Sequence, residues 1–144
     1  MNLCRLIYVS RAVSSIDPKS IKAIAEVSAS RNHELGVSGI LLATRTSYLQ
    51  VLEGEIPPVN QIYRSILGDM RHSEVTLIGY EPIAESQFKQ WAMKGISTDL
   101  MGRILARKLK EKYGEVENDL KIPLDAHMAF ALLLDVYSFL KENA

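Results

Sequence analysis

The sequence predicts an α+β fold of the ferredoxin-like type, a sandwich in which the elements follow one another as β-α-β-β-α-β-β. Short apolar stretches with a two-residue period, typical of strands, recur along the first two thirds of the chain, and two helical patterns separate them. The last third carries helical patterns alone. We therefore expect residues 1–98 to form the sheet-containing domain and residues 99–144 to form a C-terminal helical annex that covers the other face of the sheet.

The first strand is expected over Leu3–Ser10, a run rich in branched and aromatic side chains. Because side chains alternate along a strand, one face carries Cys4, Leu6, Tyr8 and Ser10, and the other carries Leu3, Arg5, Ile7 and Val9. Both faces are largely apolar, so both are expected to be covered. Further strands are expected over residues 37–43, 48–53, 75–83 and 88–96.

Two helices are expected between these strands. The first begins at Asp17-Pro18, since Asp suits the N-cap and Pro the first helical position, and it ends at Gly36. Its inward stripe consists of Ile21, Ile24, Ala25, Ser28 and Asn32. The second helix starts at Pro57-Pro58, and its amphipathic stripe consists of Val59, Ile62, Tyr63, Ile66, Leu67 and Met70.

The annex is expected to hold two more helices. Asp99 can cap the first, which would run to about Tyr113, and a polar connector over residues 114–123 follows it. The second, Ala126–Leu140, is apolar around most of its circumference. A helix of that kind needs more than one packing surface, which predicts contact with both the sheet and a partner chain.

Composition and charge exclude several classes of protein. Seventeen basic residues balance seventeen acidic ones, which argues against a nucleic-acid binder that relies on phosphate neutralisation. The N-terminus lacks a signal-peptide pattern, and no apolar run approaches the ~20 residues of a membrane span, so we expect a cytoplasmic protein without a membrane anchor. The single cysteine, Cys4, excludes an internal disulfide framework.

Motifs that would indicate an enzyme are missing from the sequence. There is no glycine-rich dinucleotide fingerprint, no P-loop, no C-x-x-C, no H-E-x-x-H and no G-x-S-x-G elbow. The three histidines, His33, His72 and His127, are too scattered to suggest a metal site. No nucleophile, metal or phosphate cradle is therefore expected.

Three polar residues occupy positions where apolar ones are expected: Tyr8 and Gln50 in the middle of strands, and Asn32 at the end of the first helical stripe. A buried amide without a partner costs about 1–3 kcal/mol, so each of them needs hydrogen bonds. They are either separate core residues that bond to the backbone, or they converge on a flat polar ligand between the helices and the sheet.

Five blocks of the sequence closely resemble the signature of BLUF domains, which are blue-light sensors that bind FAD non-covalently. They occur in order between residues 3 and about 98, and the annex is similar to that of the short, stand-alone PixD-like members. The blocks are Leu6–Ser10 (LIYVS), Asn32–Gly39 (NHELGVSG), Tyr48–Gly54 (YLQVLEG), Asp69–His72 (DMRH) and Phe88–Met93 (FKQWAM).

The resemblance implies a photochemical role for four residues. Tyr8 matches the tyrosine that donates an electron and a proton after light absorption, and Gln50 matches the glutamine whose amide lies between that tyrosine and the flavin. Rearranged Gln50 hydrogen bonds would shift the absorption slightly to the red. Trp91 and Met93 match fifth-strand residues that reorient near Gln50 and pass the signal on.

The resemblance also implies a set of flavin contacts. Asn32 matches the side chain that bonds the pyrimidine edge of the ring, while Ile24 and Ile66 match the aliphatic residues on its two sides. Further contacts are implied for Asp69, Arg71 and His72.

As a member of this family the chain is expected to be a photosensor and not an enzyme. It would form a homo-oligomer and signal by binding another protein, such as a response-regulator-like partner. Two alternatives remain open on the sequence: a flavin-dependent enzyme on the same scaffold, and a ferredoxin-like module that binds a small ligand or serves assembly.

Overall fold

A five-stranded sheet forms the centre of the protein, whose computed structural model describes residues 2–143. Its strands lie in the order β4-β1-β3-β2-β5, and all neighbours are antiparallel except β2 and β5. This order is the ferredoxin-like arrangement with one strand added, as the sequence predicts. The strands are β1 (Leu3–Ala12), β2 (Ser38–Ala43), β3 (Ser47–Glu55), β4 (His72–Ile83) and β5 (Lys94–Ser97).

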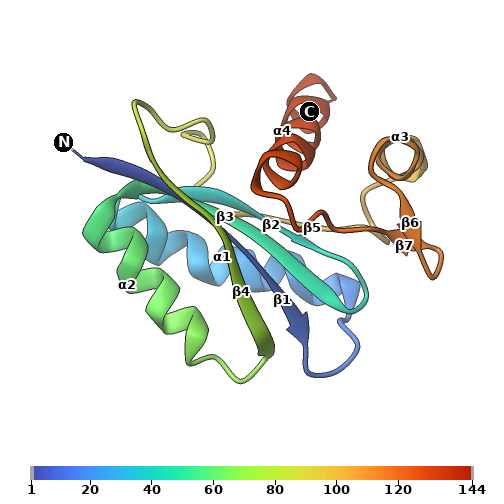
Figure 1. Cartoon of the computed structure of the whole chain (residues 1–144), viewed down its shortest axis with the longest axis horizontal. Helices are drawn as coiled ribbons and strands as arrows, with labels where there is room; N and C mark the ends of the chain where they lie inside the picture. Colours follow the sequence, from blue (N-terminus) through green and yellow to red (C-terminus); the bar gives the residue numbers. More distant parts are fainter. Residues whose placement is uncertain (1, 144) are drawn as a thin grey trace.

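Helices cover both faces of the sheet (Figure 1). Helices α1 (Pro18–Glu34) and α2 (Ile56–Leu67) lie on one side, and α4 (Ala126–Glu142) lies on the other, with α3 (Arg103–Tyr113) beside it. The alternation of β1 divides its side chains as expected: Leu6 and Tyr8 pack with α1 and α2, whereas Ile7 and Val9 pack with the annex. The expected cover of both sheet faces is therefore confirmed.

Helix α1 begins where its capping residues predict. The Asp17 carboxylate accepts a hydrogen bond from the backbone N–H of Lys19 at 3.0 Å. The helix lies close against β5 at Gly95. A Cβ atom there would come within 2.6 Å of the Ile21 carbonyl oxygen. Glycine at this position fixes the distance between α1 and the sheet, and α1 provides one wall of the site described below.

Helix α2 is shorter than its apolar stripe predicts. It ends at Leu67 with Gly68 at the C-cap, so Met70 lies outside the helix and is 89% exposed. Val59 and Ile62 are buried as expected. Strand β4 begins soon afterwards, at His72, which is earlier than predicted.

The expected strand over residues 88–96 is wrong for most of its length. Strand β5 spans only Lys94–Ser97, and Trp91 and Met93 lie in the irregular segment that precedes it. The backbone N–H groups of Gln87 and Phe88 bond to a glutamate side chain and not to a neighbouring strand. Regular pairing therefore starts only after Met93.

The annex also differs from the expectation. Helix α3 begins at Arg103, after Gly102 in a positive-φ conformation of 95°, whereas the backbone N–H of Asp99 bonds to the Ser97 hydroxyl in a turn. The connector contains a small hairpin of β6 (Glu115–Val116) and β7 (Asp119–Leu120). Its two turn residues both have positive φ, which is the geometry of a type I′ turn.

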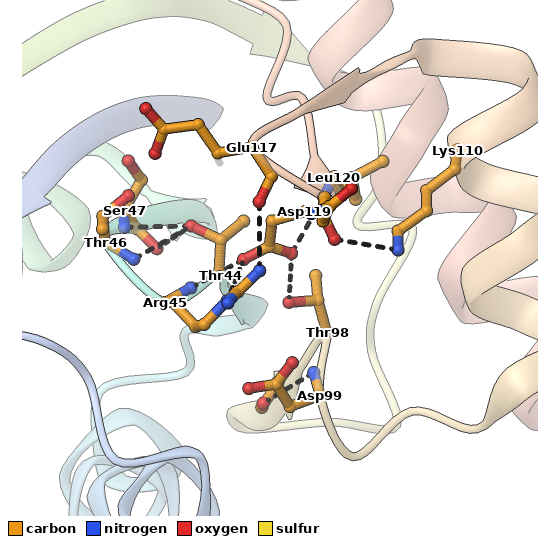
Figure 2. A network of polar contacts seen from close by, with 12 residues as sticks. Thr44, Arg45, Thr46, Ser47, Thr98, Asp99, Lys110, Glu117, Asp119 and Leu120 are labelled. Carbon is orange, nitrogen blue, oxygen red and sulfur yellow. Dashed lines mark hydrogen bonds and ion pairs between the residues drawn. The ribbon is translucent and has the colours of Figure 1, made fainter.

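The carboxylate of Asp119 joins this hairpin to the sheet (Figure 2). It accepts hydrogen bonds from the Arg45 backbone N–H at 3.0 Å and from the Thr98 hydroxyl at 2.8 Å. Arg45 lies in the turn between β2 and β3, and Thr98 directly follows β5. The annex is thereby held against one end of the sheet by side chains distant in sequence.

Between residues 2 and 143, no helix combines the length and the apolar character needed to cross a membrane.

Candidate functional site

A cavity of about 600 Å³ lies between α1, α2 and the sheet. The two helices provide its side walls, β1, β2 and β3 provide its floor, and the turn between α2 and β4 closes one rim. Every residue predicted to contact a cofactor lines it, namely Tyr8, Ile24, Asn32, Gln50, Ile66, Asp69, Arg71 and His72. The structure thus brings together residues as far apart in the sequence as Tyr8 and His72.

Tyr8 and Gln50 form a hydrogen-bonded pair on the floor. They lie directly opposite each other on the antiparallel strands β1 and β3, so their side chains share one face of the sheet. The Tyr8 hydroxyl donates to Gln50 Oε1 at 2.5 Å, and both residues are buried. Burial raises the pKa of Tyr8 well above its ordinary value, and nearby Tyr48 and Asp69 add to the effect. The phenol is therefore a protonated donor.

The other end of the Gln50 amide contacts Met93, whose sulfur accepts from Nε2 at 3.2 Å. Gly39 leaves space beside this contact. A Cβ atom at this position would overlap the Val51 carbonyl oxygen and would lie 3.2 Å from the Met93 methyl group. Neither Met93 nor Trp91 is among the residues that line the cavity, and Trp91 lies on the side of the annex. Its ring packs edge-on against Tyr137 of α4, with the centroids 4.7 Å apart.

Asn32 lines the cavity and has a buried acceptor that is not used by the described residues. Its Nδ2 donates to the Ala92 carbonyl at 3.0 Å, while Oδ1 is buried without a hydrogen-bond partner among the described residues. The side chain is almost fully buried, at 1% exposure of the residue. An unsatisfied buried acceptor costs about 1–3 kcal/mol, so this atom fits a ligand that brings an N–H donor into the cavity.

Asp69 and Arg71 form an ion pair at the rim. The guanidinium bonds to the carboxylate at 2.5 Å, and the Arg71 backbone N–H adds a further bond at 2.9 Å. The hydrogen bond from Arg71 is the main cause that lowers the pKa of Asp69 to about 2. The Arg71 side chain is 56% exposed at the mouth of the cavity, and the Asp69 carboxylate balances its charge.

His72 lies beside this pair and faces Tyr48 and Ser10. Its Nδ1 is 2.7 Å from the Ser10 hydroxyl, and its ring centroid is 4.6 Å from that of Tyr48. Burial lowers the pKa of His72, with Asp69 opposing and Arg71 reinforcing that change. The ring is thus neutral at neutral pH, so the position of its one proton depends on the tautomer.

Several lining residues were not among the predicted contacts. Tyr48 could have been found, because it is two residues before Gln50 and hence on the same face of β3. Similarly, Ser65 and Ile62 lie on the inner side of α2 with Ile66. The full additional set is Val27, Ser28, Arg31, Leu41, Tyr48, Ile62 and Ser65.

The geometry fits a flat, mostly apolar group with one polar edge. Ile24 on α1 and Ile66 on α2 supply apolar walls, while the amide side chains of Gln50 and Asn32 supply polar groups. An isoalloxazine ring has this distribution of apolar faces and a polar pyrimidine edge, so the residues present fit a flavin. Fold and site together define an α+β domain with a cavity suited to a planar cofactor.

Comparison with known protein families identifies the domain. Residues 3–94 match the family described as "BLUF: Sensors of blue-light using FAD". Since this match covers more than half of the chain, the protein belongs to the BLUF family of blue-light sensors. FAD is the cofactor that this family uses.

Two curated relatives illustrate the similarity. Photoactivated adenylate cyclase subunit beta of Euglena gracilis is 30% identical over 100 residues, which are 68% of this chain but only 12% of the relative. The blue light- and temperature-regulated antirepressor BluF of Escherichia coli strain K12 is 35% identical over 82 residues, covering 56% of this chain and 20% of the relative. The chain therefore matches only a small part of these longer proteins.

Solved structures of similar proteins have the same fold. The dark-state structure of BlrB, a BLUF protein, superposes with a TM-score of 0.74 at 29% identity and covers 96% of each chain. A bacterial light-regulated adenylyl cyclase gives a TM-score of 0.70 at 30% identity, covering 76% of this chain and 32% of that one. These likenesses agree with the predicted fold class, including the C-terminal helices in the case of BlrB.

Proposed function

We propose that the protein is a photoreceptor that binds FAD non-covalently in the cavity between α1 and α2, and that it signals without catalysing a reaction itself. One observation carries this proposal: the hydrogen-bonded pair of Tyr8 and Gln50 lines the same cavity as Asn32, whose Oδ1 has no partner among the described residues. If Tyr8 and Gln50 were instead ordinary core residues whose polar groups bond to the backbone, no cavity beside them would be expected.

The bound flavin supplies the absorption of blue light and an electron acceptor in its excited state. Tyr8 is the donor, and its hydroxyl already points its proton at Gln50 Oε1. Loss of an electron makes a phenol far more acidic, so the proton moves along this short bond to the amide. When electron and proton return, the Gln50 amide can settle in a different orientation or tautomer, because its two ends differ in donor and acceptor character.

The change at Gln50 reaches the annex through the segment that contains Met93 and Trp91. Reorientation of the amide alters the bond from Gln50 Nε2 to the Met93 sulfur. Two residues away, Trp91 contacts Tyr137 of α4. Movement of this short segment would therefore change the contact between Trp91 and the C-terminal helix α4. The signalling role of Met93 and Trp91 thus belongs to the segment before β5, not to the strand.

We propose that the light signal is passed on through contacts with other protein chains. Half-buried apolar side chains of α4, among them Leu134 and Phe139, support a homo-oligomer in which a second copy covers this helix. The names of the relatives state light-regulated outputs, which supports a protein partner for this chain, and we propose a response-regulator-like one. Residues 1–98 would form the photosensor and residues 99–144 the annex that carries these contacts.

The visible spectrum of the purified protein tests the proposal. A yellow protein with a small, reversible red shift under blue light supports the photosensor. A yellow protein without that shift would instead favour a flavin-dependent enzyme, and a colourless protein would favour a small-ligand or assembly module.

Tyr8→Phe sharpens this test, because it removes the phenolic proton and keeps the buried ring. The variant should retain flavin and lose the shift, whereas Tyr80→Phe, on the exposed side of β4, should behave like the wild type. If Tyr8→Phe cycles normally, another residue must be the donor.

A further inference from the structure

Glu53 is a fully buried carboxylate on the face of the sheet that the photochemistry does not use. It lies on β3 three residues after Gln50, so the two side chains point to opposite faces. Its exposed fraction is 0%. Among the other side chains of β3, only Gln50 is also buried, polar and of similar size. A charged group is rarely placed there unless its partners are also fixed.

Both oxygens of Glu53 are occupied by donors from distant segments. Oε2 accepts from Arg5 Nε on β1 at 2.7 Å. Oε1 accepts from the backbone N–H groups of Gln87 at 2.7 Å and Phe88 at 3.2 Å. The carboxylate thus fixes the start of the irregular segment that ends at Met93.

Arg5 connects the same carboxylate to the annex. Its guanidinium lies 3.8 Å from the ring centroid of Phe130 on α4, and it reaches Glu81 on β4 at 3.1 Å. The Phe88 ring packs edge-on against Phe130 and against Tyr137, the residue that also contacts Trp91. Glu53, Arg5 and Phe88 therefore form one contact region beneath α4.

The segment from Phe88 to Met93 is held at both ends and at points between them. The Trp91 backbone N–H bonds to the Phe88 carbonyl at 2.9 Å, and the Trp91 carbonyl accepts from Gly39 at 3.0 Å. Asn32 donates to the Ala92 carbonyl. Because Phe88 is fixed at one end, a displacement at Met93 has to be taken up by the few residues between them, which include Trp91.

We propose that Glu53 is a positioning residue for the light response: it anchors Gln87 and Phe88 so that Met93 meets Gln50 on one face of the sheet and Trp91 meets α4 on the other. The proposal rests on the photosensor function proposed above. It adds that the signal leaves the cavity by bending a segment whose far end is fixed by a carboxylate on the opposite face.

Glu53→Gln tests this with little change of volume, and Glu81→Gln is the matched control. Both substitutions neutralise a carboxylate that pairs with Arg5, but Glu81 is 59% exposed and touches neither Gln87 nor Phe88. Hydrogen exchange of the peptide over residues 84–93, measured by mass spectrometry in the dark, should be about fivefold or more faster in Glu53→Gln, since charge-assisted bonds to its amides are weakened. Glu81→Gln should match the wild type.

A second readout separates positioning from plain structural support. Dark recovery of the red-shifted state should be about threefold or more faster in Glu53→Gln, because a looser segment lets the Gln50 amide return more easily. The flavin and the red shift itself should remain, since Tyr8 and Gln50 are untouched. Faster exchange with an unchanged recovery rate would make Glu53 a structural residue only and overturn the proposal.

A double variant covers the possibility that Glu53→Gln does not fold. Arg5→Gln combined with Glu53→Gln leaves no unpaired buried charge and should show the same faster exchange and recovery. Exchange in this variant equal to that of Glu81→Gln would refute the anchor. If instead the wild type binds flavin but shows no red shift, the proposed function fails and this proposal falls with it, while exchange still reports whether Glu53 anchors the segment.

Discussion

The buried polar groups on the two faces of the sheet differ in how fully the protein satisfies their hydrogen bonds. On the face covered by α1 and α2, Tyr8 and Gln50 border a cavity, and Asn32 Oδ1 has no partner among the described residues. On the face covered by α4, the Glu53 carboxylate is surrounded by protein donors at both oxygens. A buried polar group that lacks a partner in the protein can bond to a ligand, whereas one fully satisfied by distant segments can hold those segments together.

The largest expected effect is on the cavity face. Gln50→Leu keeps the volume of the side chain but removes its donors and acceptor, so the red shift under blue light should be abolished while flavin stays bound. A light-minus-dark difference spectrum measures this. Gln61→Leu, the same change on the exposed side of α2, is the control; a normal difference spectrum in Gln50→Leu would contradict the mechanism.

On the opposite face, the expected effect is on stability. Glu53→Ala leaves Arg5 buried without its main partner and frees two backbone N–H groups, so the free energy of unfolding should fall by about 3–5 kcal/mol. Urea denaturation in the dark measures the change. Glu81→Ala should cost far less, because that carboxylate is exposed; equal losses in both variants would remove the distinction between them.

Asn32→Ala tests the unpartnered acceptor itself. Removal of the amide loses one or two hydrogen bonds to a ligand in the cavity, about 1–3 kcal/mol or roughly 5–150-fold in flavin affinity. Titration of the apoprotein with FAD gives the dissociation constant. Asn60→Ala, on α2 outside the cavity, should leave it unchanged. Identical constants for Asn32→Ala and the wild type would show that Oδ1 does not meet the ligand.

The smallest expected effect concerns pH. Burial lowers the pKa of His72 below its ordinary value of 6.5, so at mildly acidic pH the unfolded chain binds a proton that the folded chain does not. Stability should therefore decrease as the pH falls from 7 to 5. His72→Gln should reduce this decrease in the melting temperature, and His127→Gln, exposed on α4, should not. A wild-type slope in His72→Gln would show that other groups cause it.

Much of the cavity face could be predicted from the sequence because it depends on local periodicity. Alternation along β1 and β3 places Tyr8 and Gln50 on the same side of their strands, and the helical stripe of α1 brings Ile24 and Asn32 inward. The order of strands and helices and the cap at Asp17 follow from equally local patterns. The resemblance to BLUF domains then indicated which of these inward residues line one cavity.

The annex face was decided by the tertiary structure. The strand expected over residues 88–96 is largely absent: the N–H groups of Gln87 and Phe88 bond to the Glu53 carboxylate, 34 and 35 positions away, and the Trp91 N–H bonds to the Phe88 carbonyl. The Asp119 hairpin likewise depends on Arg45 and Thr98 (Figure 2). Periodicity reports which side of an element is buried, but not which distant side chain will satisfy a given backbone group. That choice is made only when the segments pack, and it is strongly selective because a buried backbone group left without a partner costs about 1–3 kcal/mol.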